Sequence, residues 1–351
     1  MTDLHELVPD FSILVNGSEL STDILVDVVG VSVHQDVNAA SMFTIRMMTW
    51  DIQKSELTWV DDSLFNVGNT VSIKMGYVDH VQEVIAGEIT GLELEYIAAE
   101  PPQLVVRGYD RRHRLLRGRK TKSFLNMKDS DIAKQIAGNH SLSPTVVDTK
   151  VKLDYVLQHN QTDMEFLLDR AQRIGYEVVV EDKKLYFRPR QVAGSEALTL
   201  DLQQDLLEFF PRLTAVTQVG EMSVRGWDIK KKEAITGKAT SESTKLGSKT
   251  GTKAAGTFGT RAEWSVERPV STKAEADAIA QGRFDEMALA YVTAEGKILG
   301  NTSLKAGEIV KIEGAGKRFS GKYYVTSAVH TYMPRTGYET NFTLRRNATD
   351  G

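Results

Sequence analysis

The highest density of charge in the sequence lies at residues 107–122, RGYDRRHRLLRGRKTK, where eight Lys or Arg accompany one acidic residue, Asp110. If all eight faced one polyanion, they would form a phosphate-binding stripe whose affinity falls steeply with salt. However, Leu115 and Leu116 interrupt the run, and basic residues in such runs are commonly solvated or paired with acids. We therefore expect a paired or solvated face rather than a nucleic acid site, with a basic rim as a weaker form of the hypothesis. The candidate basic interface residues are Arg111, Arg112, Arg114, Arg117 and Arg119.

Other patterns that could bind phosphate or support catalysis are weaker. The segment GSKTGTK around Gly247 and Gly251 lacks the G-x-x-x-x-G-K-[ST] spacing of a phosphate loop and lies in low-complexity sequence, outside any expected strand or helix. No G-x-S-x-G motif is present, and adjacent acids such as Asp61 and Asp62 are typical of a solvated turn. We expect no catalytic residue and no enzymatic activity.

Metal ligands do not stand out either. None of the seven histidines forms H-E-x-x-H, and those in the middle and last parts of the chain lie in separate segments without ligand spacing. These are His113, His140, His159 and His330, which we expect to be structural or on the surface. The absence of cysteine excludes disulfides, thiolate zinc sites and cysteine nucleophiles, and it fits synthesis in a reducing cytosol. We expect no metal and no cofactor.

The composition is that of an ordinary globular protein. The chain has 351 residues, 41% hydrophobic and 26% charged, which suggests two or three domains. Its 43 Lys and Arg and 47 Asp and Glu give a net charge of -4, so no overall field draws it to nucleic acid or anionic lipid. The first residues lack the features of a signal peptide, and no uncharged apolar stretch reaches the ~18 residues of a membrane span. We expect neither secretion by a signal peptide nor membrane insertion.

The first half of the chain changes periodicity once. Residues 1–110 hold short alternating or β-branched runs between turn residues, which predicts a first β-barrel. Residues 111–195 predict a small α+β module with two helices and a hairpin. Its clearest element is a helix that begins with a capping box at Thr162 and Glu165 and ends at Gly175.

Strand patterns return in residues 196–232 and 291–346, which together predict a second β-barrel. The intervening residues 233–290 predict a flexible loop followed by a capped helix. Among residues 236–260, 15 are Gly, Ser or Thr, so this stretch cannot bury enough apolar surface to order by itself, and we expect it to be flexible in the free protein. The helix begins at Thr272, and its apolar stripe packs either within its own domain, the commoner arrangement, or at a subunit interface.

One stretch of sequence has an echo far downstream. LFNVGNTVSIKMGY at 64–77 resembles LKAGEIVKIEGAG at 304–316, and Gly87 and Gly321 each restart a strand after a further loop. The matched positions are Gly68 with Gly307, Val71 with Val310, and Ile73 with Ile312. A short glycine-turn-strand match can arise by chance, but the all-β context on both sides favours an internal duplication.

Four stretches together resemble a known family. They are RGYDRRHRLLRGRKTKSFLNMKDSDIAKQIA, LQHNQTDMEFLLDRAQRIGYEVVVEDKKLYFRPR, FFPRLTAVTQVGEMSVRGWDIKKKEAITGKA and LGNTSLKAGEIVKIEGAGKRFSGKYYVTSAVHTY. In this order they resemble the phage late-control D proteins, the baseplate hubs of contractile tails, which are related to the N-terminal part of VgrG spikes. The likeness covers nearly the whole chain and is most specific from Gln158 to Phe187.

The resemblance implies an α+β, mainly β fold of two tail-tube-like antiparallel barrels with smaller domains between them, assembled as a homotrimer. Two similar barrels per chain in a threefold ring would offer six quasi-equivalent surfaces to a hexameric tail tube protein and three to a trimeric spike. Tape-measure and baseplate wedge proteins are further implied partners. Such a protein would be assembled in the bacterial cytoplasm and carried in a virion tail or a secreted contractile particle.

Two alternatives stay open. VgrG spikes continue into an OB-like domain and a β-helix, and this chain ends at TLRRNATDG without either, so the spike is a separate protein or was removed. The chain could therefore be the hub portion of a VgrG-like spike that delivers effectors. The weakest hypothesis is an enzyme that uses the basic middle module on polysaccharide or nucleic acid.

Overall fold

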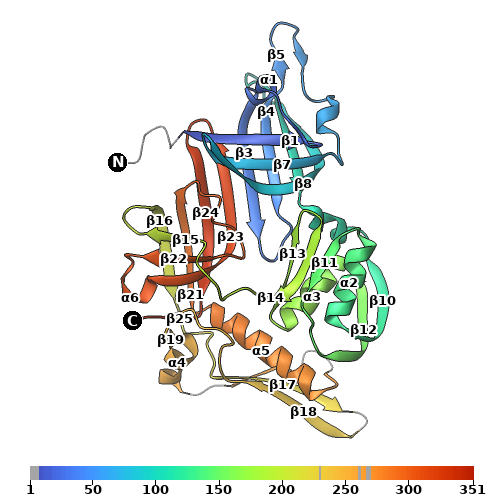
Figure 1. The fold of residues 1–351 in the computed structure, drawn as a ribbon, viewed down its shortest axis with the longest axis vertical. Coiled ribbons are helices and arrows are strands. Elements are labelled where there is room, and N and C mark those ends of the chain that lie inside the picture. The colour runs from blue at the N-terminus through green and yellow to red at the C-terminus, as the bar shows by residue number, and fades with distance from the viewer. Residues whose placement is uncertain (1–7, 229–230, 260–261, 266–269) are drawn as a thin grey trace. The chain divides into compact units, whose positions relative to one another are not determined.

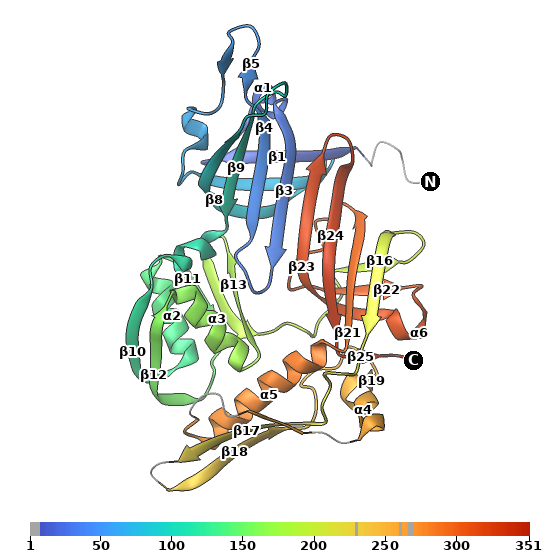
Figure 2. The same ribbon diagram turned by 180° about the vertical axis from the view of Figure 1, so that it is seen from behind.

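The computed structural model describes the chain except for residues 1–7, 229–230, 260–261 and 266–269 (Figures 1 and 2). The chain folds as two compact units. Unit 1 comprises the residues up to His113 together with Lys297–Ala306 and Ser327–Phe342, and unit 2 comprises Arg114–Gly296, Gly307–Thr326 and Thr343–Gly351. The fold is mainly β, as the sequence predicts.

Unit 1 is built on one antiparallel sheet in the order β2-β1-β7-β8-β9-β4-β3-β23 (Figure 2). The strands are β1 (Pro9–Val15), β2 (Ser18–Glu19), β3 (Val28–Asp36), β4 (Met42–Met48), β7 (Thr70–Tyr77), β8 (His80–Glu95), β9 (Gln103–Tyr109) and β23 (Gly321–Met333). Alternate residues such as Ile13, Ile45 and Ile73 face one core because successive side chains of a strand point to opposite faces. Among the described residues no pairing closes this sheet, so closure into a barrel stays a prediction.

Shorter elements complete unit 1. They are the helical turns α1 (Thr22–Leu25) and η2 (Ser63–Phe65), the hairpin of β5 (Trp50–Asp51) and β6 (Glu56–Leu57), and η3 (Arg111–Leu116), which leads into unit 2.

The same sheet continues on the other side of β23, which also pairs with β24 and β22, so that the strand order there is β16-β21-β24-β23-β22-β15. Its further strands are β15 (Leu198–Asp201), β16 (Leu206–Leu213), β21 (Val292–Leu299), β22 (Ile309–Glu313) and β24 (Gly337–Arg346). β22 is antiparallel to β23 and parallel to β15. A helical turn, α6 (Gly316–Phe319), joins β22 to β23.

The predicted α+β module lies in unit 2 and has its own apolar core (Figure 1). Helices α2 (Asp129–Asn139) and α3 (Asp163–Arg173) accompany the antiparallel pair of β10 (Lys120–Lys128) and β12 (Lys152–Gln161) and the strands β11 (Ser143–Val146), β13 (Tyr176–Glu181) and β14 (Lys184–Pro189). The capping box is confirmed: Thr162 Oγ1 accepts a hydrogen bond from Glu165 N at 3.1 Å, and Glu165 Oε2 accepts one from Thr162 N at 2.9 Å. The predicted hairpin is also confirmed as β13 and β14.

Helix α5 (Lys273–Leu289) packs on a separate sheet of β17 (Glu221–Asp228), β18 (Glu233–Ala239) and β20 (Ala262–Ser265). Ala276, Ile279 and Phe284 of its apolar stripe are buried against this sheet, which confirms the intradomain interpretation of the stripe. β17 therefore pairs in this sheet and not in the sheet of β22, where the strand pattern of 196–232 predicted it. Alternation of apolar and polar residues indicates that a strand forms but not which strand it pairs with. Here β17 pairs with β18 in a hairpin.

The polar stretch 236–260 is structured up to Gly259 and so differs from the loop that its composition predicts; Thr260 lies outside the described residues. It contains the end of β18, then β19 (Lys249–Thr250), α4 (Gly251–Ala255) and η4 (Gly256–Phe258). Its backbone groups are satisfied by the last residues of the chain. Asn347 Oδ1 accepts from Leu246 N at 2.9 Å, and β19 pairs with β25 (Ala348–Thr349). Distant hydrogen bonds replace the apolar burial that the stretch lacks.

Candidate functional site

The two echoed stretches have the same turn conformation. Gly68 and Gly307 have φ angles of 97° and 93°, a left-handed conformation that glycine adopts most easily. The N–H of Gly68 donates to a carbonyl in β8, and the N–H of Gly307 donates to a carbonyl in β23. In both cases the acceptor residue's own N–H donates back to the carbonyl of the residue that follows the glycine. The four bonds are Gly68 N to Ile89 O (2.8 Å), Ile89 N to Asn69 O (2.9 Å), Gly307 N to Val325 O (2.8 Å) and Val325 N to Glu308 O (2.9 Å).

The strands that follow these turns are buried at the matched positions. Val71, Ile73, Val310 and Ile312 are each at most 2% exposed. The pairing partners correct one detail of the alignment. Val71 and Ile73 lie opposite Gly87 and Ile85, whereas Val310 and Ile312 lie opposite Tyr323 and Gly321. Gly321 therefore takes the place of Ile85, and the match of Gly87 with Gly321 is displaced by two positions.

The likeness extends to two sets of five strands within the large sheet. In spatial order the sets are β3-β4-β9-β8-β7 and β16-β21-β24-β23-β22. Numbered along the chain, both sets read first, second, fifth, fourth, third. The outer neighbours differ, because β1 is antiparallel to β7 while β15 is parallel to β22.

The edges of the two sets are occupied differently. The outer edge of β3 pairs with Ser327–Tyr332 of β23. The equivalent strand β16 has no neighbour on its outer side among the described residues. On the same basis, residues Gly91–Glu95 of β8 pair with β9 but with no strand on their other side. Because Ile89 corresponds to Val325, the unpaired segment of β8 corresponds to the segment of β23 that covers β3.

The candidate basic residues do not form one exposed stripe. Arg111 is buried with its Nε 3.2 Å from Glu88 Oε1, and Arg112 is buried with its Nη2 2.7 Å from Asp110 Oδ2. Arg117 and Arg119 are exposed, and Arg114 is half-buried. Arg119 pairs with Glu165 Oε1 at 2.7 Å.

Three of the four histidines singled out have partners. Nε2 of His113 lies 2.8 Å from Glu88 Oε2, and Nε2 of His140 lies 2.7 Å from Asp163 Oδ2. His330 Nδ1 lies 2.8 Å from Tyr338 Oη, and burial lowers the pKa of His330 to about 4. His159 is exposed. The described residues contain no group of three or more potential ligands that could hold a metal ion.

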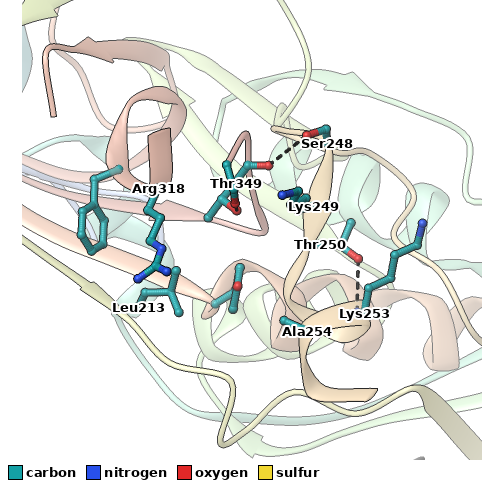
Figure 3. A pocket seen from close by; sticks show the side chains of 11 residues that line it. Leu213, Ser248, Lys249, Thr250, Lys253, Ala254, Arg318 and Thr349 are labelled. Carbon is teal, nitrogen blue, oxygen red and sulfur yellow. Dashed lines mark hydrogen bonds between the residues drawn. The ribbon is translucent and has the colours of Figure 1, made fainter. Parts of the chain in front are cut away.

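A cavity of about 760 Å³ in unit 2 was not anticipated from the sequence (Figure 3). It is lined by Leu213, Ser248, Lys249, Thr250, Lys253, Ala254, Tyr291, Arg318, Phe319, Thr349 and Gly351. Part of the GSKTGTK segment forms one wall, as β19 and the start of α4, so this segment lies between a strand and a helix after all. The remaining walls come from residues that are far away in sequence, which no local motif could reveal.

Solved structures with the same fold are tail proteins. The 43 kDa tail protein of prophage MuSo2 from Shewanella oneidensis matches with a TM-score of 0.72 and 13% identity, over 97% of this chain and 100% of that chain. The tail protein from Neisseria meningitidis MC58 matches with a TM-score of 0.68 and 14% identity, over 97% and 96%. The E. coli c3393 protein, a component of the type VI secretion system, matches with a TM-score of 0.62 and 12% identity, over 96% and 77%.

Comparison of the sequence with known proteins gives a match to one family model. No curated protein matches the chain. In the part of the chain that the structure describes, no helix is long and apolar enough to cross a membrane. The model of the Alg8 N-terminal domain family matches residues 5–333, and the chain belongs to this family.

Proposed function

We propose that this protein is the structural hub of a contractile tail or injection system, a homotrimer that joins a hexameric tail tube to a trimeric central spike. The observation that carries the proposal is the repeated five-strand order: the edge of β3 is covered by β23, whereas the equivalent edge of β16 and the segment Gly91–Glu95 of β8 have no partner among the described residues. The tail-protein fold of the matching solved structures supports it.

The unpaired edges suggest how three chains make a ring with six similar positions. Within one chain, β3 is covered by the Ser327–Tyr332 segment of β23. In the ring, β16 of one copy would be covered by the corresponding segment of the next copy, Gly91–Glu95 of β8. Three internal and three intermolecular junctions then alternate, and the edges of β3 and β16 are both covered. Duplication of the five-strand set is thus the device that lets a threefold assembly match a sixfold tube.

The assignment is structural rather than catalytic. We expect contacts with the tube and spike proteins, with tape-measure and wedge proteins as further partners, and no turnover in lysis or nuclease assays. The exposed Arg117 and Arg119 remain candidates for a basic contact on this assembly.

A second candidate is the hub portion of a VgrG-like spike that delivers effectors. One observation favours it: the chain matches the Francisella PdpA–VgrG complex structure over 99% of its own length but 54% of that chain, with a TM-score of 0.58 and 8% identity. An OB-like domain and a β-helix encoded in the same reading frame would support this candidate, whereas a separate spike gene would support the phage-type hub.

The proposed pairing of β16 with β8 of the next copy can be tested by removing one backbone hydrogen-bond donor from the outer edge of β16. Thr214 N donates to Tyr291 O, so N–H groups at odd positions of β16, such as Leu207, point to the outer edge because they alternate along a strand. Pro211 already occupies one of these positions, as expected on an edge strand. Leu207→Pro removes an outward N–H, whereas the control Leu207→Ala keeps it.

We expect wild type and Leu207→Ala to sediment as trimers, and Leu207→Pro to shift toward monomer without losing its thermal unfolding transition. A wild-type protein that stays monomeric with its spike partner present would contradict the hub. A Leu207→Pro variant that still forms trimers would reject the edge pairing but not the trimer.

A further inference from the structure

The cavity of Figure 3 carries an excess of positive charge. Lys249, Lys253 and Arg318 line it from β19, α4 and α6. No ion pair joins any of these three side chains to a carboxylate in the described part of the chain. Like charges gathered at one concave surface repel each other and attract a counter-ion. The cluster is therefore more favourable with an anion bound than without one.

The walls of the cavity are tied together by a buried residue. The Arg346 side chain is 0% exposed, and its guanidinium donates to the carbonyl oxygens of Ser320, next to α6, and Leu246, next to β19. Arg346 also pairs with Asp350 Oδ2 at 2.6 Å, so this nearby carboxylate is already engaged. Arg346 thus links the segment that carries Arg318 to the segment that leads into β19 and Lys249, so this part of the site is formed before any ligand arrives.

Neutral groups add donors beside the charges. The hydroxyls of Ser248, Thr250 and Thr349 belong to the lining, and each can donate to an anion by rotating its proton. Burial raises the pKa of Tyr291, so its phenol stays protonated at neutral pH and is a further donor. No Asp or Glu belongs to the lining. A concavity that is rich in donors and has no acidic side chain in its lining favours anions with many acceptor oxygens.

We propose that this cavity binds a small polyanion that carries phosphate groups. Its volume lies within the roughly 300–1,000 Å³ typical of small-molecule sites. Two ammonium groups and one guanidinium on different walls suit a ligand with several charged oxygens better than a single carboxylate. The GSKTGTK spacing is not that of a nucleotide-hydrolysing loop, so we infer binding without turnover. The inference does not depend on the hub assignment.

Calorimetric titration of the full chain with sodium tripolyphosphate tests the site. The wild-type protein should bind with one-to-one stoichiometry, and its affinity should fall when the salt concentration is raised. Replacing Lys249, Lys253 and Arg318 by glutamine should weaken binding by more than about tenfold, because several charge-assisted contacts are lost. The control replaces the exposed Lys152, Lys183 and Lys184 by glutamine, which removes the same charge elsewhere.

The titrations distinguish a specific phosphate site from nonspecific binding and from a site for acidic peptides. Equal weakening in the cavity variant and the control would reject a specific site, as would the absence of binding to wild type. Binding of pentaglutamate but not tripolyphosphate would overturn the phosphate assignment in favour of an acidic peptide. Arg318→Lys, which keeps the charge, should retain most of the affinity, and unchanged melting temperatures would show that the variants are folded.

Discussion

At the scale of single residues, the fully buried Arg346 is expected to contribute to the stability of unit 2. Its guanidinium satisfies two carbonyl groups and lies 5.4 Å from the ring centroid of Tyr323. Arg346→Met leaves those carbonyls without a partner in a buried site, so we expect a loss of about 3 kcal/mol in the free energy of unfolding. Urea denaturation measures this loss. The half-exposed neighbour Arg345 is a control, since Arg345→Met should cost no more than about 1 kcal/mol.

His330 makes the stability depend on pH. Burial and the charge of Lys305 lower the folded-state pKa of His330 to about 4, from the ordinary histidine pKa of about 6.5. Between these values the unfolded chain binds a proton that the folded chain does not, so stability is complete above pH 6.5 and falls as the pH drops toward 4. The loss is on the order of 3 kcal/mol. In urea titrations at pH 7 and pH 5, His330→Gln should lose less stability between the two values than wild type. The exposed His159→Gln should behave like wild type, and identical pH dependence in all three would contradict this role for His330.

At the scale of elements, the contact of α3 with α5 depends on two glycines. Gly175 ends α3 with a φ of 70°, and a Cβ added to Gly282 of α5 would lie 2.5 Å from Gly175 N. Helix propensity alone would make Gly282→Ala stabilising by about 1 kcal/mol. We expect it instead to destabilise unit 2, because backbone must move to admit the methyl group.

Gly138 in α2 provides the matched control for that prediction. Nothing lies within 4 Å of a Cβ at this position, so Gly138→Ala should stabilise by about 0.5–1 kcal/mol. Thermal unfolding of the two variants should move the transition in opposite directions. A stabilising Gly282→Ala would show that α5 is not closely packed against the turn after α3.

The elements that sequence reasoning predicted well are those that are determined locally. The cap of α3 joins two residues three positions apart, Thr162 and Glu165. The turn at Gly68 needs a positive φ, which a glycine in the sequence favours. Partner choice is a long-range property, so the parallel pairing of β15 with β22 and the separate sheet of β17 were not predicted. The prediction of a flexible loop at residues 236–260 was wrong for the same reason, because Asn347, which accepts a hydrogen bond from Leu246, lies about a hundred residues downstream. The cavity was missed because its cations are brought together only by the fold.

At the scale of the whole molecule, the lengths of the connections between strands bear on the proposed binding to a tail tube. The connections at 114–190 and 214–291 occur once per chain and break sixfold equivalence. The strand ends on the opposite side carry shorter connections in both five-strand sets. There Ile97 after β8 and Met333 at the end of β23 are exposed, and they correspond under the same alignment that matches Ile89 with Val325. Equivalent apolar residues in both sets suit a partner with six identical subunits.

The matching prediction concerns binding to the tube. Replacing Ile97 and Met333 by aspartate should reduce co-sedimentation with tail tube polymers by about tenfold or more, because charges would enter an apolar contact. The mass of the hub itself should not change. The control replaces the exposed Leu125 and Tyr155 of the β10–β12 pair by aspartate, which should leave tube binding intact. Equal loss of binding in both variants would contradict a specific docking end.

The open edges of β8 and β16 have a consequence for how the protein behaves before its particle exists. Head-to-tail contacts close into a ring of three only when each step turns by one third of a circle, and a rotation that does not close gives an open helical filament. If these edges pair between copies, a concentrated solution of the isolated chain can form either a closed trimer or an open filament. The spike, by holding three copies around one axis, would act as the template that chooses the triplet.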